Sequence, residues 1–280
     1  MTEIRDVARR IGRLVLILAA IYSGLLYVFW AYEPSFVFAR LQRPGVAPAE
    51  AGAKDFVEVE VPTEDGIKLY GWWRAPPGHG AVILFTGTGA SLIDYGGLVA
   101  DLAAHGFGVL GIDYRGNGAS PGIPSERAWR TDARAAFDFV NQRAPQAKIA
   151  LFGQSMGSGF AVGLALERPV VGIVLDSAYA SVVRLFARSG LPLFHLPFPA
   201  RLLMADRIDS EALIGRVHVP IIMLHGTEDG AIPLAEARRL YAAANEPKEL
   251  IEVAGAGHAA VWFGPYRERA LSALAEWTKQ

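Results

Sequence analysis

The stretch Gly153-Gln154-Ser155-Met156-Gly157 lies between an apolar run, residues 148–152, and a helix-forming segment, residues 158–167. This order predicts a strand, a sharp turn and a helix, with the serine hydroxyl raised above the sheet. Glycines at both ends of the motif allow a tight turn without a steric clash. The backbone N–H of Met156 would then point to the place where an oxyanion forms. Because G-x-S-x-G also occurs in ordinary loops, its meaning depends on the rest of the chain.

Strands and helices alternate on both sides of this motif. A strictly alternating run followed by a turn and a second run predicts an antiparallel hairpin over residues 56–61 and 67–74. Short apolar runs typical of buried parallel strands cover residues 81–85, 108–112, 149–152, 170–175 and 221–224, with an edge strand over 248–253. Helices are expected over residues 92–105, 125–143, 155–167, 234–244 and 266–278. The pattern predicts an α/β fold, a mostly parallel eight-stranded sheet with helices on both faces.

An apolar segment precedes this domain. Residues 14–32 carry no charge over 19 positions, and a helix rising about 1.5 Å per residue would nearly span a hydrocarbon core of roughly 30 Å. A cleaved signal peptide is the alternative, but the run is longer than a typical signal core and ends in Trp30-Ala31-Tyr32, which suits the membrane interface. We therefore expect a cytoplasmic N-terminus over 1–13, an anchor over 14–32, a linker over 33–55 and one domain over 56–280.

The charge distribution predicts an orientation and excludes some functions. Four arginines precede the apolar segment and two follow it closely, so the positive-inside rule places the main domain outside the cytoplasm. The formal net charge is −1, which gives no sign of a nucleic-acid partner. The chain has no cysteine, which excludes disulfides, thiolate catalysis and cysteine-ligated metals. Nothing in the sequence indicates an oligomeric state.

A serine nucleophile needs a base and an orienting acid, and both residue types follow predicted strand ends. Asp229 comes after the strand over 221–224, and His258 comes after the strand over 248–253. Because open α/β sheets bind ligands beyond the carboxyl ends of their strands, Ser155, Asp229 and His258 can converge. Asp176, at the end of the preceding strand, is the alternative acid.

The remaining histidines have simpler interpretations. His225 precedes Gly226 and is expected to order the loop that carries the acid. His195 lies in a proline-rich segment and could contact substrate. The other three have ordinary surface or core contexts, namely His79, His105 and His218.

The loop over residues 85–91 is expected to supply the second oxyanion donor, by position the backbone N–H of Thr88. Its glycines do not make a phosphate loop, since no Gly-Lys-Ser/Thr follows. They do not make a dinucleotide fingerprint either, because Gly87-Thr88-Gly89 lacks the third glycine.

Residues 177–216 interrupt the strand–helix rhythm. The segment contains Leu191-Pro192-Leu193-Phe194-His195-Leu196-Pro197-Phe198-Pro199 and the basic residues Arg184, Arg188 and Arg201. It connects two core strands, so it must include a crossover helix and loop. We also expect it to act as a small apolar lid over the site, because long insertions in compact domains are often functional.

Taken together, these motifs resemble the α/β-hydrolase superfamily, most closely the small membrane-anchored α/β-hydrolase-domain-containing proteins. The resemblance runs from about residue 56 to the C-terminus. It is carried by the serine motif, the two loops with Asp229 and His258, and the stretches 63–66, 71–73, 113–120 and 124–126. The chain departs from the family pattern at Thr86-Gly87, where the family usually has His-Gly. That change concerns the packing of the oxyanion loop.

The resemblance implies a serine esterase, lipase or thioesterase. Ser155, Asp229 and His258 would be the catalytic triad, Met156 and Thr88 would hold the oxyanion, and neither a metal nor an organic cofactor would be required. The anchor and the apolar lid suggest a small, lipid-like or acylated substrate drawn from the membrane. A peptidase of the same fold and a non-enzymatic membrane-anchored scaffold are the alternatives, since the fold does not select among them.

Overall fold

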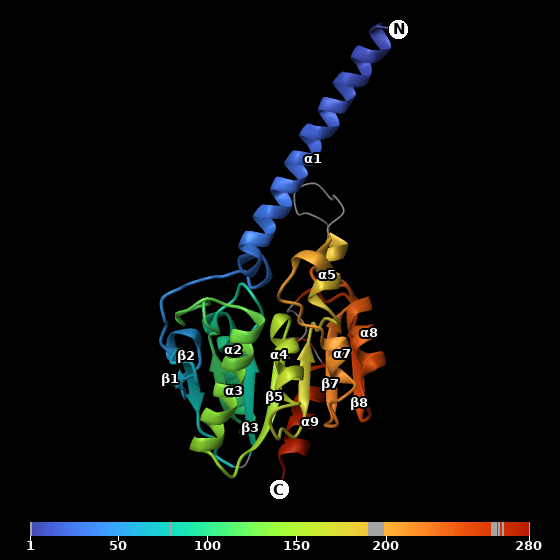
Figure 1. The fold of residues 1–280 in the computed structure, drawn as a ribbon. Coiled ribbons are helices and arrows are strands. Elements are labelled where there is room, and N and C mark those ends of the chain that lie inside the picture. Colours follow the sequence, from blue (N-terminus) through green and yellow to red (C-terminus); the bar gives the residue numbers. More distant parts are fainter. Residues whose placement is uncertain are drawn as a thin grey trace.

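An eight-stranded sheet forms the centre of the protein in the computed structural model, which describes residues 2–78, 80–189, 199–258, 262, 264 and 266–279 (Figure 1). The strands follow the order β1-β2-β4-β3-β5-β6-β7-β8 across the sheet. Their bounds are β1 Val57–Pro62, β2 Lys68–Arg74, β3 Gly80–Phe85, β4 Gly108–Ile112, β5 Lys148–Gln154, β6 Ile173–Asp176, β7 Ile221–Gly226 and β8 Lys248–Val253. Strands β1 and β8 are therefore the two edges of the sheet.

Strand pairing confirms the predicted fold class. The hairpin β1–β2 and the pair β2–β4 are antiparallel, and every other neighbouring pair is parallel. The carboxyl ends of β3 to β8 consequently lie along one edge of the sheet. The strand β5, which leads into the serine motif, lies between β3 and β6 near the middle of the sheet. That position places Ser155 where neighbouring strand ends can supply partners.

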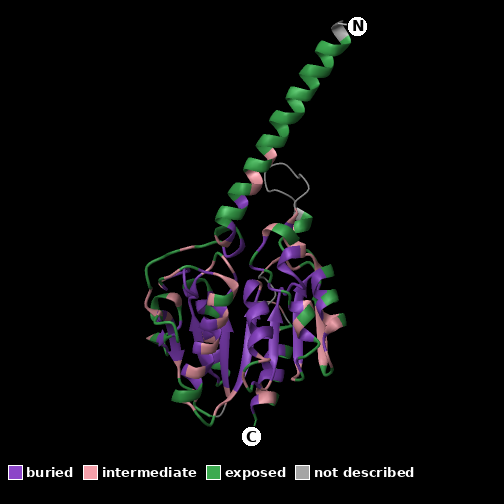
Figure 2. Ribbon diagram, in the orientation of Figure 1, coloured by how far each residue is buried: buried purple, intermediate pink, exposed green. Residues whose placement is uncertain are grey.

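Helices cover both faces of the sheet (Figures 1 and 2). One buried cluster includes side chains of α3, α4, α7 and α8, and a second cluster on the other face includes α2 and α9. The helices are α1 Thr2–Val37, α2 Gly96–Ala104, α3 Glu126–Arg143, α4 Met156–Leu164, α5 Val182–Ser189, α6 Ala200–Leu203, α7 Ser210–Ile214, α8 Leu234–Ala243 and α9 Arg267–Thr278, with short 3₁₀ turns at η1 Pro48–Ala51 and η2 Leu92–Tyr95. The helix expected over 92–105 thus starts as a 3₁₀ turn, and the one expected over 155–167 ends at Leu164.

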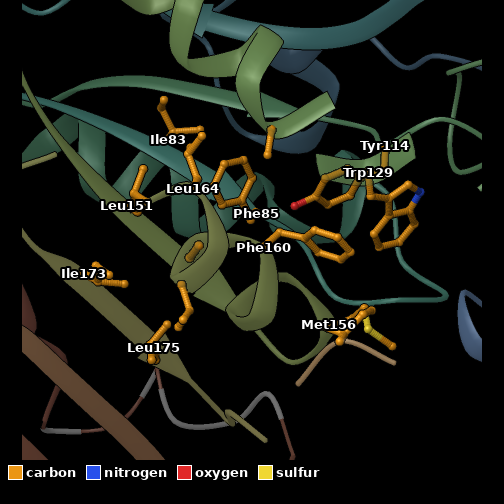
Figure 3. Packing of buried hydrophobic residues seen from close by; sticks show 14 of the residues in the cluster. Ile83, Phe85, Tyr114, Trp129, Leu151, Met156, Phe160, Leu164, Ile173 and Leu175 are labelled. Carbon is orange, nitrogen blue, oxygen red and sulfur yellow. The ribbon is translucent and has the colours of Figure 1, made fainter. Parts of the chain in front are cut away.

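Aromatic side chains stack beneath the serine helix α4 (Figure 3). The rings of Tyr114 and Trp129 are parallel with centroids 4.1 Å apart, and Phe160 of α4 lies 5.2 Å from Trp129. Phe38, which follows α1, lies 4.7 Å from Trp129 and is fully buried. Aromatic packing of this kind buries much apolar area and fixes the position of α4.

The N-terminal helix α1 extends away from the domain as a rod with an exposed apolar surface (Figures 1 and 2). It is long and apolar enough to cross a membrane. It continues to Val37, so the first residues of the linker expected over 33–55 are helical. Its last turns are also part of the core, because Phe29 and Val37 are almost fully buried.

The rest of the predicted linker lies on the domain as a strap. Arg43 N donates to the carbonyl of Gly118 at 2.9 Å, and Gly118 N donates to the carbonyl of Leu41 at 2.7 Å. The hydroxyl of Tyr70 donates to the carbonyl of Val46 at 2.8 Å. These bonds hold the strap against the loop after β4 and against β2.

The segment predicted as a lid contains α5, α6 and α7. Helix α5 lies at the carboxyl edge of the sheet, the end from which α1 emerges, whereas α7 lies beside β7 (Figure 1). Residues 190–198, with His195 and most of the proline-rich stretch, are outside the described residues, as is His79.

Candidate active site

Ser155 lies at the turn between β5 and α4 in a strained backbone conformation. Its φ is +48° and its ψ is −121°, a region that residues with a side chain rarely adopt outside functional turns. Both flanking glycines are sterically required. A Cβ on Gly153 would lie 2.8 Å from the carbonyl oxygen of Gly157, and a Cβ on Gly157 would lie 2.1 Å from that of Phe85. Any larger residue at either position would push the turn away from the sheet.

Replacing Gly157 with alanine is therefore expected to destabilise the protein by more than about 3 kcal/mol, because the new methyl group meets backbone that cannot move aside. The matched control is Gly163→Ala in the same helix, where the new Cβ meets the flexible end of Arg130 at 2.6 Å. That change is expected to alter stability by about 1 kcal/mol or less. Thermal or urea unfolding of both variants checks the prediction, and equal stability of the two would contradict it.

The three side chains predicted for a triad lie in one hydrogen-bonded line. His258 Nε2 lies 3.2 Å from Ser155 Oγ, and His258 Nδ1 lies 2.8 Å from Asp229 Oδ2. Ser155 follows β5, Asp229 follows β7 and His258 follows β8, so three strand ends bring together residues up to 103 positions apart. In the neutral tautomer that suits this line, Nδ1–H donates to the carboxylate and Nε2 accepts the serine proton.

Backbone donors fix the carboxylate of Asp229. Its Oδ1 accepts hydrogen bonds from Ala231 N at 2.9 Å and Ile232 N at 2.8 Å. Burial alone would raise the pKa of Asp229, but the hydrogen bonds from His258, Ile232 and Ala231 outweigh it and leave this pKa below its ordinary value. The carboxyl group is thus held as a carboxylate, oriented toward His258.

His225 lies beneath this loop and orders it, as its sequence position suggested. Its Nε2 is 2.8 Å from the carbonyl oxygen of Ile232 and donates to it. Burial lowers the pKa of His225, which keeps its imidazole neutral. His225 therefore positions the acid loop from below the site.

The alternative acid, Asp176, has different partners. Its side chain is fully buried, and its Oδ1 accepts a hydrogen bond from Ser177 Oγ at 3.0 Å. Its Oδ2 has no hydrogen-bond partner among the described residues. Burial raises the pKa of Asp176 to about 7. His258 Nδ1–H donates to Asp229, which leaves Asp176 as a second buried carboxyl group that interacts electrostatically with the imidazole.

Charge around His258 leads to a pH prediction. The hydrogen bond to Asp229 raises the pKa of His258 above its ordinary value of 6.5, against the opposing effect of burial. Because only neutral imidazole can accept the serine proton, we expect kcat/KM to fall as the pH drops through this raised pKa. The acidic limb should have its midpoint above 6.5, and Asp229→Asn should move it to lower pH. A pH–rate profile for both proteins tests this, and a wild-type midpoint below 6.5 would contradict it.

The predicted oxyanion donors lie beside the serine. Met156 is the first residue of α4, so its N–H belongs to the positive end of the helix dipole. The loop after β3 also contacts the serine, since a Cβ on Gly87 would lie 3.3 Å from Ser155 Cβ. Gly87 N–H already donates to the hydroxyl of Tyr95 at 2.7 Å. The N–H of Thr88, the next along the loop, remains the predicted second donor.

The sequence analysis did not identify the residues that hold the oxyanion loop. Tyr95 OH bridges Gly87 N and the side chain of Gln154. Gln154 lies within the serine motif, so its position was visible as a polar residue at the end of a buried strand. Tyr95 comes from η2, and nothing in its local sequence signals this contact. In the described part of the chain, no three His, Asp or Glu side chains form a group that could hold a metal ion.

A cavity of about 370 Å³ lies beside the loop that carries Asp229. It is lined by Leu185, Phe186 and Arg188 of α5 and by Gly230, Ala231 and Pro233 of that loop. Its volume falls within the range of roughly 300–1,000 Å³ that is usual for ligand pockets. Apart from Arg188, the described lining is made of apolar residues and Gly230.

Comparison with known proteins agrees with the α/β-hydrolase fold. Residues 76–212 match the family described as "Serine aminopeptidase, S33". The chain is 35% identical to the protein Rv2307c of Mycobacterium tuberculosis over 250 residues, which is 87% of this chain and 86% of the relative. It is 30% identical to the α/β-hydrolase domain-containing protein aho-3 of Caenorhabditis elegans, over 66% of this chain and 54% of that protein. The Pyrococcus furiosus esterase Pf2001 superposes with a TM-score of 0.71 at 22% identity, over 84% of this chain and 95% of the esterase.

Proposed function

This chain belongs to the α/β-hydrolase superfamily and resembles its α/β-hydrolase-domain-containing subgroup, and we propose that it is a serine hydrolase for carboxylic esters or thioesters. One observation carries the proposal. The hydroxyl of Ser155, the imidazole of His258 and the carboxylate of Asp229 form a continuous hydrogen-bonded line with distances of 3.2 and 2.8 Å. That line supplies the activation a serine hydroxyl needs at neutral pH.

In the proposed reaction, His258 Nε2 takes the proton from Ser155 as Oγ attacks the carbonyl carbon. Asp229 holds the imidazole in the correct tautomer and stabilises its charged form. Collapse of the tetrahedral intermediate expels the alcohol or thiol, which takes the proton from His258, and leaves an acyl group on Ser155. Water activated by His258 then releases the acid and restores the hydroxyl. This sequence requires no metal or organic cofactor.

The oxyanion of both tetrahedral intermediates would accept hydrogen bonds from Met156 N–H and Thr88 N–H. Each donor of this kind contributes about 10²–10³ in rate where it is preorganised. Two features support preorganisation here. Met156 N–H is fixed by the first turn of α4, and the neighbouring loop residue Gly87 is bonded to Tyr95.

The proposed substrate is a lipid-like or acylated small molecule. The apolar cavity beside Asp229 would hold its acyl chain, and α1 would place the site at a membrane. By the positive-inside rule, the chain would be a single-pass membrane protein with its catalytic domain on the extracytoplasmic side.

The name of the matching family makes a peptidase the second candidate. An aminopeptidase must bind the ammonium group at the start of its substrate, which calls for a carboxylate beside the scissile bond. The described lining of the cavity next to Asp229 includes the cation Arg188 and no carboxylate. The positive charge of Arg188 would repel an ammonium group, whereas an acyl chain carries no charge to be repelled. A non-enzymatic scaffold, the remaining alternative, would not need the hydrogen-bonded line.

A series of p-nitrophenyl esters of increasing acyl length tests the proposal. We expect kcat/KM to rise about four-fold per added methylene while the chain still enters the cavity, from about 0.8 kcal/mol per buried CH₂. Aminoacyl p-nitroanilides, measured beside the esters, should be cleaved far more slowly. Faster cleavage of an anilide than of the esters would favour the peptidase. Failure of a fluorophosphonate probe to label the folded protein would favour the scaffold.

A further inference from the structure

A second cavity, of about 400 Å³, lies on the other side of α5 and is strongly basic. Three arginines line it, Arg184, Arg201 and Arg207, and Asp209 is the one carboxylate in its described lining. We propose that this cavity binds the phosphate of an anionic lipid headgroup in the bilayer that α1 crosses. The proposal goes beyond the hydrolytic reaction, and it rests on the membrane placement proposed above.

The arginines of this cavity are incompletely paired. Arg184 Nη2 donates to Glu211 Oε2 at 2.6 Å, but its Nη1 is buried without a hydrogen-bond partner among the described residues. Glu236 Oε2 forms an ion pair with that nitrogen at 3.6 Å, so two carboxylates balance Arg184. The uncompensated positive charge of the cavity therefore lies on Arg201 and Arg207.

The guanidinium groups of the other two arginines have no carboxylate partner in the described structure. That of Arg207 donates to the carbonyl of Arg201 at 3.2 Å and weakly to that of Met204 at 3.5 Å, while the backbone N–H of Arg207 donates to Glu126 Oε2 at 2.9 Å. The guanidinium of Arg201 has no partner among the residues described. Asp209 Oδ1 accepts from Ala212 N at 3.2 Å as the cap of α7. The lining thus keeps an excess of positive charge, and a planar guanidinium binds phosphate oxygens in pairs.

Two contacts fix this cavity to the end of α1. The buried carboxylate of Glu33 accepts hydrogen bonds from Ala205 N and Asp206 N, both at 3.0 Å. The ring of Phe29 lies 5.8 Å from that of Phe186 on α5. The segment from α6 to Arg207 is therefore attached to the last turns of the helix, at the end of the domain from which α1 emerges (Figure 1).

Where α1 leaves a bilayer, this segment would lie at the level of the headgroups. Leu202 has 85% of its surface exposed and lies next to Arg201. An exposed leucine beside unpaired arginines is the combination that binds a membrane interface, with the apolar side chain inserted and the cations on phosphates. An arginine near an anionic leaflet contributes about 1 kcal/mol, or about five-fold in affinity.

The chain has no cysteine, so Leu202→Cys creates a single labelling site in the full-length protein. The variant would carry an environment-sensitive fluorophore in nanodiscs of phosphatidylcholine with increasing phosphatidylglycerol, and quenching by headgroup-labelled nitroxide lipid would be measured. Val57→Cys is the matched control, since Val57 is exposed and starts β1 at the opposite edge of the sheet from the strand ends that carry the site.

We expect quenching at position 202 to increase with phosphatidylglycerol and to be absent at position 57. In the background Arg201→Gln/Arg207→Gln, the affinity for anionic lipid that the quenching reports should fall about 25-fold, about five-fold for each arginine lost. Arg201→Lys/Arg207→Lys, which keeps both charges, should retain most of the response. Unchanged thermal unfolding would show that the variants fold.

Quenching that is equal in neutral and anionic nanodiscs, or absent in both, would overturn the proposal. Loss of the response in sodium phosphate, but not in chloride of equal ionic strength, would identify a site for free phosphate and would overturn the lipid source. Fluorophosphonate labelling of the same samples separates this failure from a failure of the proposed reaction. That labelling depends on Ser155, which the arginine variants leave intact.

Discussion

Replacement of Ser155 by alanine is expected to lower ester turnover by about 10⁶-fold, because the acyl-enzyme pathway loses its nucleophile. The folded structure should persist, since the substitution removes one oxygen and keeps the backbone at the turn. Fluorophosphonate labelling and residual esterase activity check the loss of turnover, and thermal unfolding checks that the variant is folded. The measurement does not require the natural substrate to be known.

A neighbouring serine is the matched control for this variant. Ser158 lies one turn further along α4, is fully buried, and donates from Oγ to the carbonyl of Ser155 at 2.6 Å. Ser158→Ala should lower stability by about 1 kcal/mol through the lost hydrogen bond. Its Ser155 should still be labelled by the fluorophosphonate. If Ser155→Ala were still labelled at the wild-type rate, another residue would be the nucleophile.

The second large effect concerns the acid. Asp229→Asn is expected to lower kcat by about 10⁴-fold, because an amide donating to Nδ1 of His258 selects the wrong tautomer. The carboxylate oxygen that it replaces lies 2.8 Å from that nitrogen. The measurement is kcat at a pH well above the pKa of His258, where the wild-type imidazole is neutral.

Asp176→Asn is the control that separates the two carboxyl groups. Burial raises the pKa of Asp176 to about 7, so an amide resembles the form that it adopts through much of the acidic range. We expect activity within about ten-fold of wild type, since the Asp229–His258 hydrogen bond remains. A larger loss in Asp176→Asn than in Asp229→Asn would make Asp176 the orienting acid.

Much of the fold could be predicted because its signals are local. The alternation of residues 56–61 corresponds to β1, and the short apolar runs correspond to β3, β4, β5, β6 and β7 within a few residues. The serine motif combines a strand end, two sterically required glycines and a helix start in five positions. The residues after β7 and β8 could be selected in the same way, because the ends of parallel strands share one edge of the sheet.

Other features depend on contacts between distant residues and left no local signal. In the sequence Glu33 is an ordinary residue after an apolar segment. In the structure its carboxylate accepts hydrogen bonds from backbone N–H groups 172 and 173 positions away. Tyr95 reads as a residue inside a helix, yet its hydroxyl bridges the oxyanion loop and Gln154. The burial of Phe38 against Trp129 likewise depends on a distant partner, because Phe38 lies in the segment predicted as a linker over 33–55. Hydrophobic periodicity reports which face is buried and not which partner covers it.

The two outer strands of the sheet bear on how copies of this protein would behave if they were concentrated in the proposed membrane plane. Unpaired strand edges invite pairing with another chain, and charged side chains are a common defence. Strand β1 exposes Glu58 and Glu60, and strand β8 carries Glu249 and Glu252 in ion pairs with Arg269 and Arg238 at 2.7 Å. Two copies meeting edge to edge would bring carboxylates together or break these pairs. Crowding in two dimensions is therefore not expected to drive aggregation through the sheet.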